Sequence, residues 1–307
     1  EIEDTIRLWT EPLFLAARVD PASVRLFLVN DSSLNAFVAG GQRLFLTTGL
    51  VRRSAHAGQM IGVMAHEIGH IAGGHLARLK GQLKQAGNRA LLSQIFGAAV
   101  GVLSGNPGAA VAATAGALQV TERTLLRFSR TQESSADHAA VRFLDRTGQS
   151  SRGLLEFLDV LSGQELLQTS RQDPYVRTHP QTQNRIAFVR NHVARSPWSA
   201  QPVVPAFATM HRRMGAKLEG VRQSPAMTLR QYNAADAPVP ARYARAIAWY
   251  RDGQTDKALS AVDALIASGQ LSQLENDDLT RILTEFRTEV EDIREDELGA
   301  RTIAHEY

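Results

Sequence analysis

Residues 60–76 read MIGVMAHEIGHIAGGHL, and their apolar side chains recur at helical spacing. The spacing predicts a helix from Gln59 to Leu79, and no proline interrupts it. Inside this helix, His66-Glu67-Ile68-Gly69-His70 has the pattern HExxH. Because a helix advances by about 100° per residue, His66 and His70 lie one turn apart on one face and can reach the same metal ion.

The residue types of the motif favour zinc. Two neutral imidazole nitrogens and a carboxylate suit this ion and leave a fourth tetrahedral position open to water. Glu67 stands beside the first histidine, where it can act as a general base on a water whose pKa the ion lowers to about 7. We therefore expect one zinc ion per chain and attack on a polarised carbonyl, although an isolated HExxH also occurs by chance.

The third ligand separates the protein classes that use HExxH. A metzincin would carry a histidine at position 76, but leucine stands there and His75 is one residue out of register. His75 follows His66 by nine positions, so we expect it to project from the opposite side of the helix in a structural or surface role.

Glu133 is the strongest candidate for that ligand. Asp137 follows one helical turn later, where it can accept the free ring N–H of a ligand histidine and fix its tautomer. An ordinary solvated helix face with charges four residues apart remains the alternative. Glu122 and Glu156 are fallback ligands.

The expected fold is α+β and mostly α-helical, with a small β-sheet beside the HExxH helix. Apolar, β-prone runs predict strands at Val24–Asn30, Asn35–Ala39 and Arg43–Thr48, with a hairpin turn at Gly40-Gly41. Further helices are predicted at Arg123–Arg146 and Gly153–Leu167. An extended peptide can add to an exposed sheet edge, which either Asn35–Ala39 or Arg43–Thr48 would supply.

No charged residue occurs from Ala90 to Thr121. Residues 104–108, SGNPG, interrupt this stretch, so each half is too short to cross a hydrocarbon core of about 30 Å. The pattern predicts a helical hairpin rich in alanine and glycine. Two interpretations remain open: a buried core hairpin, or a segment that touches the membrane or covers the active site.

Prolines set the expected domain boundaries. Six of them between Ser196 and Pro240 predict a connector, 196–240, that contains one helix near Ala206–Arg222. The connector separates a metallopeptidase domain, 1–195, from a helical unit, 241–307. In the latter, the small residues, aromatics and turn glycine fall as in a tetratricopeptide helix–turn–helix (Ala246, Trp249, Tyr250, Gly253, Ala258). One repeat cannot bury its own face, so the unit packs on the first domain or begins a truncated array.

Composition excludes several kinds of site. The 307 residues include no cysteine, so disulfides, thiolate zinc sites and cysteine nucleophiles are ruled out for this chain. The net charge of +3 is small and no basic run accompanies it, so we expect a solvated surface and no nucleic-acid partner. Glu1 to Asp4 is acidic, and no signal peptide is visible.

Several motifs together resemble a known family. HExxH is followed some sixty residues later by Glu133-Ser-Ser-Ala-Asp137, and then by Thr178-His179-Pro180 and Arg185-Ile186. The combination is similar to the gluzincin metallopeptidases of the HtpX/BepA type, peptidase family forty-eight. The stretch from Asn35 to Leu50 is similar too, so the resemblance covers residues 1–195. The helical C-terminal unit makes the periplasmic BepA-like branch the nearest.

The resemblance implies roles for individual residues. His66, His70 and Glu133 would be the zinc ligands, Glu67 the base and Asp137 the partner of a ligand histidine. His179 would match a histidine that can occupy the fourth zinc position and hold the enzyme shut, so that its loop must move before catalysis. The alternative is a histidine before Pro180 at a helix start.

The resemblance also implies a function. A zinc-dependent endopeptidase would cleave unfolded or misassembled proteins in quality control of the bacterial envelope and outer membrane. Its location would be the periplasm, and its partners would include the outer-membrane assembly machinery. The alternative is a chaperone-like assembly factor that binds clients through the C-terminal unit and seldom uses a latched protease site. A purely structural zinc protein is disfavoured, because a closed site would use four protein ligands and would not need Glu67.

Overall fold

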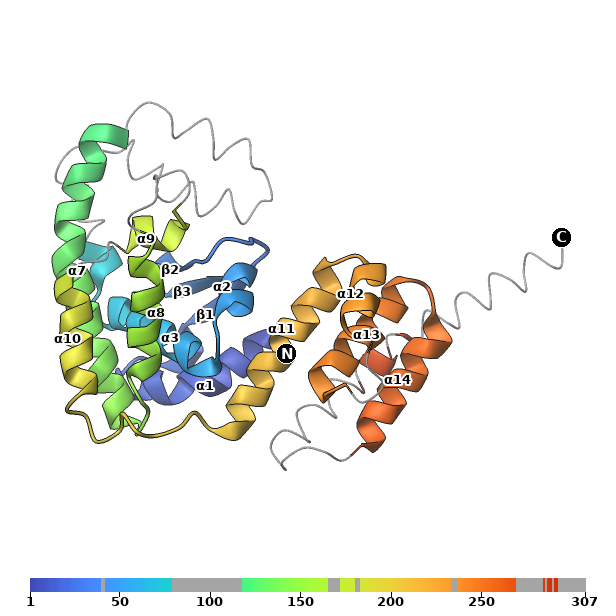
Figure 1. Cartoon of the computed structure of the whole chain (residues 1–307). Coiled ribbons are helices and arrows are strands. Elements are labelled where there is room, and N and C mark those ends of the chain that lie inside the picture. The colour runs from blue at the N-terminus through green and yellow to red at the C-terminus, as the bar shows by residue number, and fades with distance from the viewer. Residues whose placement is uncertain are drawn as a thin grey trace, which may run out of the picture. The chain divides into compact units, whose positions relative to one another are not determined.

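The computed structural model describes residues 1–39, 42–78, 118–164, 172–179, 183–233 and 237–268, with a few residues between 284 and 291. The side chains of 118–129 and of residue 177 lie outside this description. The chain divides into two compact units, Ile2–Val203 and Val204–Tyr307 together with Glu1. Figure 1 shows the helices and strands of both units.

A three-stranded sheet lies in the first unit, and its strands are β1 (Arg25–Val29), β2 (Ala36–Ala39) and β3 (Arg43–Thr47). The order is β1-β3-β2, with β3 parallel to β1 and antiparallel to β2. Three aromatic rings stack across it at directly paired positions, Phe27 on Phe45 at 5.0 Å and Phe37 on Phe45 at 4.9 Å between centroids. The predicted strands and the β2–β3 hairpin are confirmed, and the hairpin's Gly40-Gly41 lies outside the described residues.

The strand order corrects one prediction. Because β3 is paired on both sides, the segment Arg43–Thr48 cannot offer a free edge to a peptide. Strand β2, the other of the two predicted segments, is an edge strand of the sheet. Three short apolar strands carry no sequence signal for which of them lies in the middle.

The HExxH helix, α3 (Ala57–Ala72), is the core of the first unit. It packs against α1 (Ile2–Ala16), α7 (Leu118–Arg146) and α8 (Arg152–Ser162), and almost every residue from Ala57 to Gly69 is buried. Glycines permit these close contacts. A Cβ atom on Gly62 would lie 2.6 Å from the backbone nitrogen of Leu154 in α8, and one on Gly69 would lie 2.7 Å from the carbonyl oxygen of Ala136 in α7.

The predicted continuation of α3 to Leu79 is wrong. The helix ends at Ala72, and Gly73-Gly74 turns the chain, with Gly74 at a φ of 60°. This left-handed conformation is easy for glycine and breaks the helical path. The residues that follow therefore do not continue the helix.

The remaining helices of the first unit are α2 (Thr48–Arg53), α9 (Pro174–Thr178) and α10 (Gln183–Val193). Helix α7 begins at Leu118, earlier than predicted, and α8 ends at Ser162, before Gly163. Within the described part of the chain, no helix has the length and apolar character needed to span a membrane. The hairpin predicted for 90–121 lies outside the described residues up to position 117.

The second unit is helical in its described part, with α11 (Pro205–Arg222), α12 (Pro225–Gln231), α13 (Val239–Arg251) and α14 (Thr255–Ala267). Helices α13 and α14 form the predicted helix–turn–helix, and its turn is made at Gly253, whose φ is 70°. Helix α11, which sequence analysis placed in the connector, packs on α13. A core of buried residues joins α13 to α14 (Val239, Tyr243, Ala246, Ile247, Val262, Leu265). Whether this is a tetratricopeptide repeat stays a prediction, as do the predicted domain boundaries.

Candidate metal centre

The two histidines of α3 face the same point, as their spacing predicts. His66 is fully buried, and the side chain of His70 is 13% exposed. Their Nε2 atoms lie 3.0 Å apart. Both rings therefore present the same nitrogen to one side of the helix.

Glu133 on α7 completes a group of three. Its Oε2 lies 3.2 Å from Nε2 of His66, and its Oε1 lies 3.2 Å from Nε2 of His70. The close approach of α7 to Gly69 brings this carboxylate within reach, because a larger residue at position 69 would push Ala136 away. The motif glycine thus sets the distance between the two helices that carry the group.

His179, which follows α9, is the fourth member. Its Nδ1 lies 3.1 Å from both carboxylate oxygens of Glu133 and 3.4 Å from Nε2 of His66. One ligand atom from each of the four residues lies within 4.8 Å of the others. Zinc ligands with bonds of about 2.0–2.1 Å in a tetrahedron are about 3.3 Å apart, so the group fits such an ion in both donor type and spacing.

Glu67 lies beside this group. Its carboxylate is buried, and neither oxygen makes a hydrogen bond with the part of the chain that the structure describes. Burial raises its pKa. His179, whose Nε2 lies 3.4 Å from Oε1, and the nearby Tyr175 side chain oppose this shift. A buried carboxylate without a hydrogen bond fits a base whose partner is a bound water or substrate.

Asp137 and Arg185 support the group from behind. Asp137 Oδ1 accepts a hydrogen bond from Nδ1 of His66 at 2.8 Å. Arg185 on α10 donates from Nε to Asp137 at 2.6 Å, and its Nη1 lies 3.0 Å from Glu133 Oε2. Burial alone would raise the pKa of both carboxyls, but the histidines hold the pKa of Glu133 below its usual value, and Arg185 with His66 does the same for Asp137. Both therefore stay ionised at neutral pH.

The two α3 histidines differ in protonation when no metal is present. Burial lowers the pKa of each. For His66, the hydrogen bonds to Asp137 and Glu133 outweigh burial and raise the pKa to about 9. For His70, burial prevails and the pKa falls to about 3, so this ring is neutral. A single proton on His66 thus balances part of the carboxylate charge.

His75 does not project from the opposite side of α3, which corrects the sequence prediction. The turn at Gly73-Gly74 brings it back, and its Nδ1 lies 3.1 Å from Nδ1 of His70. The side chain is buried, and burial lowers its pKa. It is thus a structural partner that orients the ring of His70, so that Nε2 faces Glu133.

The segment that carries His179 is attached at its start by Asp173. This carboxylate accepts the backbone N–H of Leu34 at 3.0 Å and both Nη atoms of Arg53, each at 2.8 Å. The backbone N–H of Tyr175 donates to the carbonyl of Leu34 at 3.4 Å, and the Tyr175 ring stacks on His179 with centroids 4.3 Å apart. We call the contacts of Asp173 with Leu34 and Arg53 the clasp.

The structure brings together the predicted residues His66, Glu67, His70, Glu133, Asp137 and His179. Of the fallback ligands, Glu156 lies apart and pairs with His56 at 2.6 Å, while the side chain of Glu122 lies outside the description. Sequence reasoning missed the roles of Tyr175 and Asp173, misplaced His75, and quoted Arg185 without a role. Asp173, Tyr175 and Arg185 lie more than 100 residues after HExxH, and no spacing relates them to the motif.

The chain is similar in sequence to known proteases. The chain is 27% identical over 245 residues to the beta-barrel assembly-enhancing protease of Escherichia coli K12, covering 79% of this chain and 50% of that protein. It is 25% identical over 176 residues to the Escherichia coli metalloprotease YcaL, covering 57% of this chain and 63% of YcaL. The chain thus spans about half the length of the first of these relatives. The model of peptidase family M48 matches residues 10–193, well over half of the chain. The chain belongs to peptidase family M48.

Proposed function

We propose that this chain is a zinc-dependent endopeptidase, with His66, His70 and Glu133 as ligands and Glu67 as the general base. Membership of peptidase family M48 supports a metallopeptidase. One observation carries the finer assignment: three ligand atoms converge, while the buried carboxylate of Glu67 lies beside them without a hydrogen bond in the described chain. A structural metal site has no need of such a group.

In this proposal, a bound zinc ion supplies Lewis acidity for the scissile carbonyl and for water. Glu67 takes the proton from the attacking water and delivers it to the leaving amine. Its raised pKa suits both transfers, because a base that also returns a proton works best with a pKa near the operating pH. Asp137 holds Nδ1 of His66 as a donor, so Nε2 is left as the ligand atom.

The substrate would be an extended peptide added to the edge of β2. Residues 35, 37 and 39 pair with β3, as the bond from Thr47 N–H to the carbonyl of Asn35 shows for the first of them. Alternation then directs the N–H and C=O groups of Leu34, Ala36 and Val38 outward. Leu34 already pairs with Asp173 and Tyr175, and Ala36 is fully buried, so the partly exposed Val38 would bind the substrate backbone. Backbone pairing tolerates many sequences, which suits unfolded proteins as substrates.

His179 would act as a latch. One ring nitrogen faces Glu133 and His66 and the other faces Glu67, so the imidazole lies between the ligands and the base. The attacking water would have to occupy this space. The ring must therefore leave before hydrolysis, and the chain as described is in a closed state.

The cellular role rests on the relatives. One of them is named a beta-barrel assembly-enhancing protease. We propose by analogy that this chain acts in the periplasm, on misassembled outer-membrane proteins and beside their assembly machinery. Contact of residues 90–121 with lipid is part of the same hypothesis. A chaperone-like assembly factor is the second candidate, and the latch favours it because a closed site would seldom cut.

The test compares bound zinc and casein hydrolysis in the wild type, Glu67→Gln and Glu133→Ala. We expect one zinc per chain in the wild type, the same zinc content without activity in Glu67→Gln, and weakened zinc binding in Glu133→Ala. The peptidase proposal would be contradicted if the wild-type chain binds no zinc. It would also be contradicted if the zinc-loaded His179→Ala variant does not hydrolyse casein. Full cellular function of Glu67→Gln would favour the assembly factor.

A further inference from the structure

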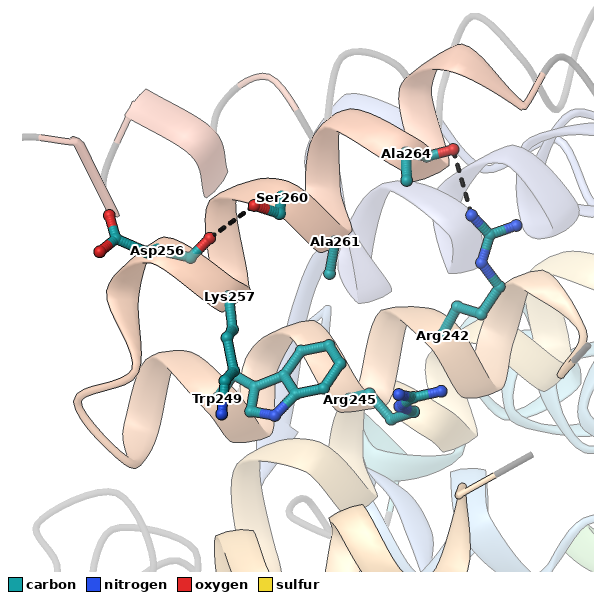
Figure 2. A pocket seen from close by; sticks show the side chains of 8 residues that line it. All are labelled: Arg242, Arg245, Trp249, Asp256, Lys257, Ser260, Ala261 and Ala264. Carbon is teal, nitrogen blue, oxygen red and sulfur yellow. Dashed lines mark hydrogen bonds between the residues drawn. The ribbon is translucent and has the colours of Figure 1, made fainter. Parts of the chain in front are cut away.

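A groove of about 450 Å³ runs between α13 and α14 in the second unit. It is lined by three residues of α13 and five of α14 (Arg242, Arg245, Trp249, Asp256, Lys257, Ser260, Ala261, Ala264). In Figure 2, Arg242 and Ala264 lie at one end, Trp249 and Lys257 lie at the other, and Arg245 lies between them. The groove is therefore elongated along the two helices.

The walls of the groove are cationic. Three of its side chains are basic and only Asp256 is acidic. The guanidinium of Arg242 is positioned by a hydrogen bond of 3.1 Å to the carbonyl of Ala264, and Lys257 Nζ donates to Gln254 at 2.6 Å. Because each side chain keeps further N–H groups beyond these bonds, an anion can be bound without breaking them.

The groove also has an apolar surface. The carbon of the Arg245 guanidinium lies 4.7 Å from the centre of the Trp249 ring, in the geometry of a cation–π contact. Ala261 and Ala264 line the opposite helix with small side chains. A ligand that carries both an apolar group and negative charge would match this combination.

We propose that the groove binds an acidic peptide segment of a partner protein. Carboxylates would meet Arg242, Arg245 and Lys257, and an apolar side chain would pack on Trp249 and the two alanines. Such binding goes beyond peptide hydrolysis and does not depend on it. It names the chemistry of a partner for the C-terminal unit.

The dimensions favour a peptide over a small anion. Arg242 and Trp249 are seven positions apart on one helix, which is about 10 Å. This length corresponds to three residues of an extended chain at about 3.3 Å each. A lone phosphate would fill little of the groove and would leave the indole uncovered. Nucleic acid and anionic lipid are tested as competitors.

The experiment measures fluorescence anisotropy of a labelled heptapeptide of alternating glutamate and phenylalanine. The full chain is used as Glu67→Gln, so that the probe is not cleaved and binding is separated from catalysis. The probe is expected to bind, and the same peptide with glutamine for glutamate is expected to bind at least about tenfold more weakly.

Lys257→Glu tests the groove directly, because this exposed residue can change without loss of the core. It should weaken binding by about tenfold or more, since like charges then face each other. Trp249→Ala should also weaken it. Arg212→Glu is the matched control: it reverses an exposed cation on α11 in the same unit, outside the groove, and should leave affinity within about twofold.

Four outcomes would overturn the proposal. The probe does not bind, the glutamine peptide binds equally well, or Arg212→Glu weakens binding as much as Lys257→Glu does. In the fourth, an oligonucleotide, inorganic phosphate or phosphatidylglycerol vesicles displace the probe more effectively than unlabelled peptide does, with the same dependence on Lys257. None of these results bears on zinc or on hydrolysis, so the peptidase proposal is tested separately.

Discussion

Breaking the clasp is expected to activate the enzyme. Asp173 forms a two-pronged ion pair with Arg53 and accepts the N–H of Leu34, and these bonds hold the start of the segment that ends in His179. Partial burial would raise the pKa of Asp173, but the bonds from Arg53 and Leu34 hold it below its ordinary value. The carboxylate is thus ionised, and the clasp is formed, at neutral pH.

The expected size follows from exposure. The Arg53 side chain is 44% exposed and that of Asp173 is 13% exposed. An exposed ion pair contributes about 0.2–1 kcal/mol, and a hydrogen bond to a charged group about 1.5–3 kcal/mol. Arg53→Gln removes only the ion pair and should shift the closed-to-open ratio by about 1.4- to 5-fold. Asp173→Ala also removes the bond to Leu34 and should shift the ratio by about tenfold or more.

The assay is initial-rate hydrolysis of casein by zinc-loaded protein. If His179 is the latch, both variants raise the rate, and neither raises it further in a His179→Ala background. Asp159→Asn is the control, because it breaks another exposed pair in the same unit, with Arg190, at 3.0 Å. A rate increase for His179→Ala without one for Asp173→Ala would refute the clasp and leave the latch intact. No increase for His179→Ala would refute the latch itself.

Three further predictions concern the network, the proton and the sheet edge. Arg185→Gln leaves Asp137 and Glu133 with uncompensated buried charge. Urea denaturation of the metal-free chain should show that the free energy of unfolding falls by about 3–5 kcal/mol. A fall of less than about 1 kcal/mol would contradict the network. The raised pKa of His66 contributes to the stability of the metal-free chain. This contribution is complete at a pH below the ordinary histidine pKa of 6.5 and is lost as the pH rises through about 9. Zinc binding near neutral pH should therefore release about one proton, measured by calorimetry in buffers of different ionisation enthalpy, and no release would contradict the assignment. Val38→Pro removes an outward N–H from the edge strand and should lower kcat/KM by about tenfold without unfolding the chain, whereas Val38→Thr keeps that N–H and should retain activity.

The parts of the site that periodicity alone could predict are those that share a helix, whereas His179 was predicted from the family resemblance. His66, Glu67 and His70 follow from helical periodicity, and Glu133 and Asp137 lie one turn apart in the same way. Local patterns also predict the three strands to within a residue or two. These features depend on neighbours in the chain, and a single sequence contains that information.

The remainder depends on contacts between distant segments. Arg185 reaches Asp137 from 48 residues away, and Asp173 reaches Leu34 from 139 residues away. No periodicity relates such positions. The place of His75 was wrong for a different reason: its prediction assumed a continuous helix, whereas the left-handed turn at Gly74 changes the direction of the chain.

The energetics of these contacts separate the site into a rigid part and a removable part. Helices α3 and α7 meet through buried residues at the distance that Gly69 allows, and Arg185 ties their charges together in the interior. The His179 segment, by contrast, is held at Asp173 by polar contacts. One of these partners, the side chain of Arg53, is partly exposed to solvent. These contacts include both backbone hydrogen-bonding groups of Leu34, which lies just before β2, the edge strand proposed to bind substrate. Under the proposed function, release of the segment would therefore free the space beside Glu133 and Glu67 for water and lengthen the edge at the same time. A peptide that pairs as far as Leu34 competes with the latch, so under the proposed function substrate binding itself favours the open state.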